Sequence, residues 1–262
     1  MSEPFIHFDD GAAYERMMGT WSQLVGNIFL DWLDPEPNLR WVDVGCGNGA
    51  FTQIVVDRCA PAEIQGVDPA EGQLAFARAR SAARIAEFHK GDAMALPFPH
   101  LRFEVAVMAL VIFYVPEPTK AVNEMVRVTK PGGRVATYVW DMLGGGSPTA
   151  PIQAEMRTMG VAPLSPPSLG ASRMDALQAL WSEAGLVDIQ AREIVAIRDF
   201  ASYDDFWSTA LLQPNIGPPV SAMSPPDQEQ LKSRIKQRLK SEPDGRIRYS
   251  ARASAIAGRK TA

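Results

Sequence analysis

The stretch WVDVGCGNGAF at residues 41–51 sets the interpretation of the whole chain. An apolar run that carries one acid, Asp43, leads into three glycines in five positions, Gly45, Gly47 and Gly49. A strand that ends in glycines and continues into a helix lets the backbone approach a ligand closely, and its N–H groups attract an anionic group. We therefore expect a small-ligand site at this turn; the alternative is a structural turn that binds nothing.

Residues 40–140 alternate between short apolar runs, which predict strands, and segments with apolar residues at helical spacing. Strands that alternate with helices imply right-handed crossovers and a parallel sheet covered by helices on both faces. The strand candidates are WVDV (41–44), EIQGVD (63–68), AEFHK (86–90), FEVAVMAL (103–110) and GRVATYVW (133–140), and the helix candidates begin near Gly49 and span 71–85 and 119–128.

The segments on either side of this core predict a cover and a completion of the sheet. Residues 1–39 predict an amphipathic helical cover at the N-terminus. In the C-terminal half, residues 141–262, we expect strands near 187–198 and 246–257, separated by helical insertions. With 262 residues and 46% hydrophobic content, the chain can form a sizeable core, and we expect a single globular domain overall.

Composition argues against several kinds of partner. The net charge of −4 leaves no basic footprint for nucleic acid. Two cysteines, Cys46 and Cys59, form neither a disulfide framework nor a zinc site on their own, so no metal is expected. No apolar run is long enough for membrane insertion, and the N-terminus lacks the pattern of a signal peptide, so we predict a cytoplasmic protein.

The glycine turn fits two nucleotide-binding patterns. Gly45, Gly47 and Ala50 satisfy the dinucleotide pattern G-x-G-x-x-G/A, whereas Gly45, Gly47 and Gly49 give G-x-G-x-G. An acid also ends the second strand, since Asp68 follows Gly49 by 19 positions, where a carboxylate can accept hydrogen bonds from both ribose hydroxyls. Both patterns share this acid, so Asp68 indicates a ribose and leaves the rest of the ligand open.

Three further features argue against a nicotinamide cofactor. Asp43 lies within the first strand, and a buried carboxylate there needs hydrogen-bond donors or a cation such as an ammonium group. Asp92 follows the third strand in GDAMALPFP (91–99), where a carboxylate can accept from an exocyclic amine. The run FEVAVMALVIFYVPEP (103–118) leads a buried strand into an aromatic loop, and no Tyr-x-x-x-Lys pair for hydride chemistry is evident.

With these motifs the sequence resembles the class I S-adenosylmethionine-dependent methyltransferases, in particular the small-molecule group with the ubiquinone and menaquinone C-methyltransferases. The resemblance implies a Rossmann-like, seven-stranded, mostly parallel sheet whose last strand is antiparallel. It also implies S-adenosylmethionine as cofactor, S-adenosylhomocysteine as product, and in-line transfer of the methyl group to a small acceptor. The motifs are VDVGCGNG (42–49), GVDPAEGQL (66–74), GDAMALPFP (91–99), FEVAVMALVIFYVPEP (103–118) and EMVRVTKPGGRVATYVW (124–140).

The resemblance further implies roles for individual residues. Asp43 and the backbone of residues 45–49 would hold the methionine portion, with a carbonyl near Ala109 or Leu110 facing its ammonium group. Asp68 would bind the ribose, Gln73 or Leu74 would pack on the adenine, and Asp92 would accept from the adenine amine. The expected cofactor-binding residues are Asp43, Gly45, Cys46, Gly47, Gly49, Asp68, Pro69, Gln73, Asp92, Ala93, Ala109 and Leu110.

The acceptor side is apolar and aromatic, which predicts a flat or lipophilic small molecule as substrate. No general base stands out, because Phe113 and Tyr114 occupy the positions after the fourth strand where relatives often carry histidines. Candidates for a catalytic role are His7, Tyr14 and Tyr114. The expected substrate-binding residues are Tyr14, Met18, Trp21, Phe113, Tyr114 and Asp141.

Two other functions stay open on the sequence. One is an NAD(P)-dependent oxidoreductase that uses the same turn, and the other is a protein that binds S-adenosylmethionine without turnover, in a regulatory role. Whether the chain is a methyltransferase or an oxidoreductase, we expect its partner to be a small molecule. The chain is expected to be a monomer or a homodimer.

Overall fold

Seven strands form one sheet in the order β3-β2-β1-β4-β5-β7-β6. The structure, a computed structural model, describes residues 15–261. β1 pairs in parallel with β2 and β4, and β7 pairs antiparallel with both β5 and β6, so the expected Rossmann-like sheet with an antiparallel last strand is confirmed. The strands are β1 (Arg40–Val44), β2 (Glu63–Asp68), β3 (Ala86–Lys90), β4 (Phe103–Ala109), β5 (Thr129–Trp140), β6 (Leu186–Phe200) and β7 (Ile247–Lys260).

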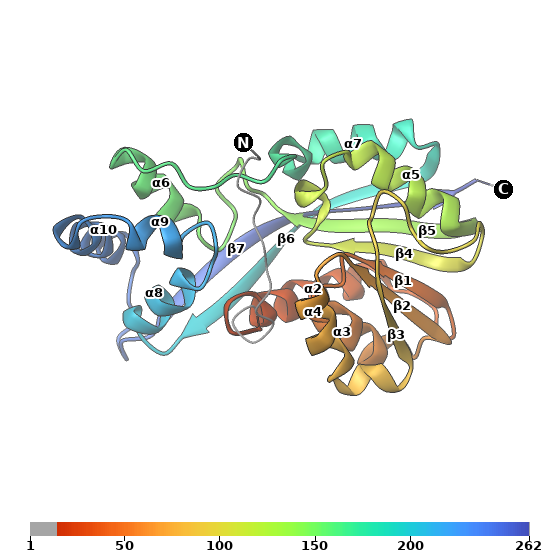
Figure 1. The fold of residues 1–262 in the computed structure, drawn as a ribbon, viewed down its shortest axis with the longest axis horizontal. Helices are drawn as coiled ribbons and strands as arrows, with labels where there is room; N and C mark the ends of the chain where they lie inside the picture. Colours follow the sequence, from red (N-terminus) through yellow and green to blue (C-terminus); the bar gives the residue numbers. More distant parts are fainter. Residues whose placement is uncertain (1–14, 262) are drawn as a thin grey trace.

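Helices cover both faces of the sheet (Figure 1). α2 (Thr20–Leu33) and α3 (Ala50–Cys59) pack together on one face, where α4 (Glu71–Arg78) also lies, and α5 (Pro118–Val128) and α7 (Met174–Glu183) pack together on the other. The central strands are apolar on both sides because both faces are covered: Val42, Val44 and Val107 are fully buried. η1 (Glu15–Gly19) precedes α2.

One helix expected from the sequence is shorter than the alanine-rich pattern suggests. The pattern predicts a helix over 71–85, but α4 ends at Arg78 and a short 3-10 turn, η2 (Ser81–Arg84), follows. The Gln53 side chain on α3 accepts hydrogen bonds from the Ala82 backbone N–H at 2.8 Å and from the Ser81 hydroxyl at 3.1 Å. These bonds across to α3 replace the hydrogen bonds that a continued helix would make.

Four helices of the C-terminal half lie together at one end of the sheet, and we call them the C-terminal layer. β6 and β7 extend well beyond the other strands as a twisted two-stranded ribbon, and the chain between them forms three helices beside that ribbon (Figure 1). Glu155 joins two helices of this layer, because its carboxylate pairs with Arg234 at 2.8 Å and with Arg238 at 2.6 Å. The helices of the layer are α6 (Ala150–Thr158), α8 (Tyr203–Leu211), α9 (Gly217–Ser221) and α10 (Pro225–Arg238). The short turns η3 (Ile112–Tyr114) and η4 (Leu169–Ser172) contact each other, and η4 also contacts α7.

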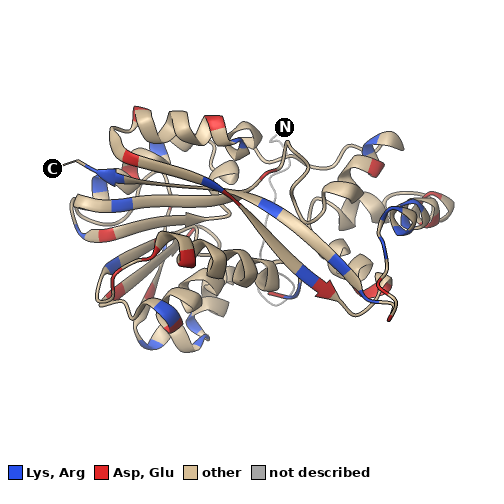
Figure 2. Cartoon of the chain, turned by 180° about the vertical axis from the view of Figure 1, so that it is seen from behind, with Lys and Arg blue, Asp and Glu red and all other residues tan. Residues whose placement is uncertain are grey.

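Both signs of charge alternate along the outer face of the β6–β7 ribbon (Figure 2). Arg252 of β7 lies 3.3 Å from Glu193 of β6, and Arg248 lies 3.9 Å from Asp199. Within residues 15–261 no helix has the length and apolar character that crossing a membrane requires.

Candidate functional site

The glycine turn folds back onto the end of β2. Gly45, Gly47 and Gly49 have φ values of 75°, 51° and 78°, in the left-handed region that favours glycine. The backbone N–H groups of Gly45 and Cys46 both donate to the carbonyl of Val67, at 2.7 and 3.0 Å. The turn is therefore fixed against the neighbouring strand before any ligand arrives.

The three glycines are required for different reasons. A Cβ on Gly45 would lie 2.6 Å from the Val111 side chain, and a Cβ on Gly49 would lie 3.1 Å from Ala77. At Gly47 the nearest side-chain atom to such a Cβ would be 3.9 Å away, on Gln73. The protein's own packing therefore excludes a side chain at Gly45, makes Gly49 a tight position, and leaves only Gly47 facing open space.

Asp43 is a buried carboxyl group with one unused oxygen. Its residue is 1% exposed, and Oδ2 accepts from the Thr52 hydroxyl at 2.6 Å. The other oxygen, Oδ1, is buried and has no hydrogen-bond partner among residues 15–261. Burial raises the pKa of Asp43 to about 7, the Thr52 hydrogen bond opposes this shift, and the negative charge of Asp68 adds to it.

The Asp68 carboxylate is hydrogen-bonded to the glycine turn. The backbone N–H of Gly47 donates to Asp68 Oδ2 at 2.9 Å, and that of Ala70 donates to Oδ1 at 2.9 Å. Each carboxylate oxygen keeps a second lone pair for another donor. Burial raises the pKa of Asp68, and these two backbone hydrogen bonds lower it.

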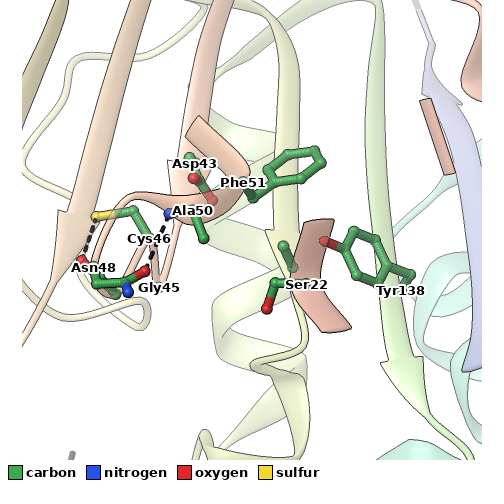
Figure 3. A pocket seen from close by; sticks show the side chains of 10 residues that line it. Ser22, Asp43, Gly45, Cys46, Asn48, Ala50, Phe51 and Tyr138 are labelled. Carbon is green, nitrogen blue, oxygen red and sulfur yellow. Dashed lines mark hydrogen bonds between the residues drawn. The ribbon is translucent and has the colours of Figure 1, made fainter. Parts of the chain in front are cut away.

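A small pocket opens between the turn and α2. Asp43 lies between the turn residues Cys46 and Asn48 on one side and Phe51 of α3, Ser22 of α2 and Tyr138 of β5 on the other (Figure 3). The enclosed space is about 20 Å³, enough for one water-sized or ammonium-sized group. Its lining residues are Ser22, Asp43, Gly45, Cys46, Gly47, Asn48, Ala50, Phe51, Ala109 and Tyr138.

Several of these lining residues were not expected from the sequence. Ser22 directly follows Trp21. The apolar stripe of that helix indicates which large side chains are buried, but it does not indicate a role for a small polar residue. Tyr138 lies in a strand that looks apolar throughout, and only the pairing of β5 with β4 brings it to the turn. Asn48 lies within the glycine turn itself. Its Oδ1 accepts a hydrogen bond from the Ala50 N–H at 3.2 Å, at the start of α3.

The other expected cofactor-binding residues lie around the same edge of the sheet. The N–H of Gly91 donates to the Asp68 carbonyl at 3.1 Å, which brings the loop with Asp92 and half-buried Ala93 beside the end of β2. Asp92 itself is exposed, and its Oδ1 accepts from the Met94 N–H at 2.8 Å. Pro69 is exposed, Gln73 and Cys46 are buried, and Leu110 has a φ of 62° with its N–H bonded to the Tyr138 carbonyl.

The residues expected on the acceptor side are not gathered in this pocket. Trp21 is 2% exposed and packs edge-on against Trp140 and Tyr249. Asp141 is paired with Arg252 at 2.5 Å and accepts from the Gly144 N–H, so its charge is already neutralised. Met18 is half-buried, the rings of Phe113 and Tyr114 lie 4.3 Å apart, and His7 and Tyr14 fall outside the described residues.

The unpaired oxygen of Asp43 is the feature of this pocket that a ligand has to satisfy. Within residues 15–261, no three His, Cys, Asp or Glu side chains gather as metal ligands. The orphaned oxygen of Asp43 instead calls for a single donor or cation in a space of that size. Gly47 links Asp43 and Asp68, because it lines the same pocket as Asp43 and its N–H donates to Asp68.

Comparisons with known proteins agree with this geometry. Residues 42–137 match the methyltransferase domain family. A ubiquinone/menaquinone biosynthesis C-methyltransferase of Cereibacter sphaeroides is 35% identical over 133 residues, which are 49% of this chain and 53% of that protein. The chain thus spans about half the length of the curated relatives it matches.

Solved structures share the fold across nearly the whole chain. Phosphoethanolamine N-methyltransferase 2 of Haemonchus contortus, in complex with S-adenosylhomocysteine, superimposes with a TM-score of 0.59 at 18% identity, over 95% of this chain and 56% of that one. The [4+2]-cyclase SpnF superimposes with a TM-score of 0.53 at 19% identity, over 99% of this chain and 88% of that one. At such identities the likeness shows the fold alone.

Proposed function

We propose that this chain, whose residues 42–137 match the methyltransferase domain family, is a class I S-adenosylmethionine-dependent methyltransferase that transfers a methyl group from S-adenosylmethionine to a small organic acceptor. The observation that carries the proposal is the buried, unbonded Oδ1 of Asp43 in a pocket the size of one ammonium group. A nicotinamide dinucleotide has no ammonium group to occupy that position, whereas the amino-acid portion of S-adenosylmethionine has one.

We assign the residues around the pocket to successive parts of this cofactor, from its ammonium group to its ribose. Asp43 would pair with the ammonium group, and Gly47 is the glycine whose surroundings leave room for a ligand. Asp68 would accept hydrogen bonds from the ribose hydroxyls with the lone pairs that Gly47 and Ala70 leave free. When bound, S-adenosylmethionine supplies a methyl group on a sulfonium that is already activated for displacement.

The task left to the protein is alignment and exclusion of water. Alignment of reacting groups supplies ~7–11 kcal/mol of a barrier of this kind. Within residues 15–261 neither histidine lines the pocket at Asp43: His89 is hydrogen-bonded to Gln65, and His100 is exposed. We propose an acceptor whose nucleophilic atom is deprotonated in solution, or whose proton passes to solvent or to one of the candidates His7, Tyr14 and Tyr114.

Transfer of a radiolabelled methyl group from S-adenosylmethionine to a panel of small phenols, amines and carbon acids tests the proposal. We expect turnover with at least one acceptor, and at least a tenfold loss of turnover at limiting S-adenosylmethionine in Asp43→Asn. The exposed Asp57 of α3 gives the control, because Asp57→Asn makes the same chemical change away from the pocket. Binding of S-adenosylhomocysteine without transfer to any acceptor would instead favour a protein that binds the cofactor in a regulatory role.

A further inference from the structure

A second cavity lies where the chain leaves the sheet for the C-terminal layer. It measures about 270 Å³, close to the size range of small-molecule sites. Met142 and Leu143, which follow the end of β5, form one wall, and Gln153 and Arg157 of α6 form another. The remaining wall consists of Leu164, Ser165, Pro166 and Leu169.

This cavity adjoins the loop that follows the cofactor edge of β4. Ala109, at the end of β4, lines the pocket at Asp43, and η3 begins three residues later. The N–H of Ser168 donates to the Phe113 carbonyl of η3 at 3.0 Å, and the Ser168 hydroxyl donates to the Val115 carbonyl at 2.7 Å. The wall at Leu169 is therefore fastened to the segment that leads away from the cofactor pocket.

Five of the eight lining residues are apolar, one is charged, and the lining surface is shared between polar and apolar atoms. Met142, Leu143, Leu164, Pro166 and Leu169 supply the apolar part, and Leu143 is 54% exposed. The apolar part suits a ring or an alkyl chain that carries a polar group at one end.

Arg157 is the single charge of the lining, and it has no acidic partner within residues 15–261. The contrast with its neighbours is informative, since Arg234 and Arg238 are both paired with Glu155 on the same helix as Arg157. Arg157 is exposed at the rim of the cavity, and a guanidinium in such a position can bind a carboxylate through two parallel hydrogen bonds. Gln153 beside it is buried, and its amide donates to the Thr149 hydroxyl at 3.2 Å, so its side chain is held in place.

We propose that this cavity binds the methyl acceptor and that the acceptor is an apolar carboxylic acid, with Arg157 binding its carboxylate and the apolar walls holding its ring or chain. The inference rests on the proposed function, which it extends by naming a substrate class. The proposed site does not involve Trp21, which was expected to bind the acceptor. That side chain is buried against its own aromatic neighbours.

The test is binding of matched acid and amide probes to the protein saturated with S-adenosylhomocysteine. The probes are benzoate, 2-naphthoate and decanoate, each compared with its uncharged amide by calorimetric titration. We expect at least one acid to bind tenfold or more tightly than its amide. Arg157→Gln is expected to abolish that preference and leave amide binding unchanged, and Arg192→Gln, at an exposed arginine of β6 outside the cavity, is expected to preserve it.

Two outcomes contradict the inference: no acid binds better than its amide, or the preference survives in Arg157→Gln. Titration of S-adenosylhomocysteine alone separates this failure from failure of the proposed function. If that ligand binds and the acids show no preference, the cofactor site stands and the acceptor class is wrong. If that ligand does not bind while the acid preference depends on Arg157, the cavity stands and the methyltransferase proposal is wrong.

Discussion

The two glycines Gly45 and Gly47 have similar backbone angles and different surroundings. Alanine at Gly45 would combine a positive φ with a contact of 2.6 Å to Val111, so Gly45→Ala is expected to cost about 2–4 kcal/mol of unfolding free energy. Gly47→Ala has the positive φ without the close contact and is expected to cost about 1–2 kcal/mol. Urea unfolding of both variants measures the difference, and equal losses would contradict this assignment.

Asp43 makes the stability of the protein depend on pH. Its pKa in the folded chain is about 7, against 3.8 as the ordinary value, so the folded state holds a proton that the unfolded state releases. The contribution to stability is complete below about pH 4 and is lost as the pH rises through 7, by up to about 4 kcal/mol.

Asp43→Asn removes the ionisable group and keeps an oxygen for Thr52. The variant is expected to be about 1–3 kcal/mol more stable than the wild type at pH 8, and no more stable at pH 5. The gain is smaller than the full ionisation cost because the new amide nitrogen is itself buried without a partner. Urea unfolding at both pH values checks this, with Asp57→Asn as control, and a variant less stable at pH 8 would rule it out.

At the residue scale, sequence alone indicates Asp43, Gly47 and Asp68 because each depends on neighbours close in the chain. It does not reveal that Val111 fills the space beside Gly45, since that contact joins two different loops. It also does not indicate Arg157, which becomes informative only once Arg234 and Arg238 are seen to pair with Glu155.

At the scale of elements, the attachment of α6 to α10 depends on one carboxylate. The Glu155 side chain is 3% exposed and binds two arginines and the Thr158 hydroxyl. Glu155→Gln keeps the shape and removes the charge, so we expect a loss of about 1–3 kcal/mol, concentrated in the C-terminal layer. Hydrogen exchange is expected to quicken in α6 and α10 and to stay unchanged in β1 and β2. Uniform quickening would show that the layer and the sheet unfold together.

Strand and helix positions follow closely from apolar periodicity, and the exceptions have identifiable causes. The strands from residues 40 to 140 are found at or near the expected bounds. β1, β2 and β4 are buried along nearly their whole length, and apolar residues therefore predominate in β1 and β4. The helix predicted over 71–85 is interrupted because the Gln53 side chain, on a different helix, binds the backbone near Ala82. Local periodicity carries no information about such a contact.

At the scale of the whole molecule, the seven-stranded, mostly parallel sheet and its antiparallel last strand follow from the family resemblance and are confirmed. The arrangement of the C-terminal layer was not predictable in detail, because its short helices are placed by the long β6–β7 ribbon and by ion pairs between distant segments (Figure 1). The cavity that we propose for the acceptor lies between this layer and the loops that follow β5. Its lining residues come from segments whose arrangement local periodicity does not determine.

Calorimetric titration of S-adenosylhomocysteine into the wild type, Asp43→Asn and Asp57→Asn at pH 8 tests the central claim most directly. We predict one molecule bound per chain and no heat from NAD⁺. The affinity is expected to be 10- to 100-fold weaker in Asp43→Asn, in keeping with loss of about 1.5–3 kcal/mol for a hydrogen bond to a charged group. We expect no change in affinity in Asp57→Asn. Binding of NAD⁺ in place of S-adenosylhomocysteine, or equal affinity in all three proteins, would contradict it.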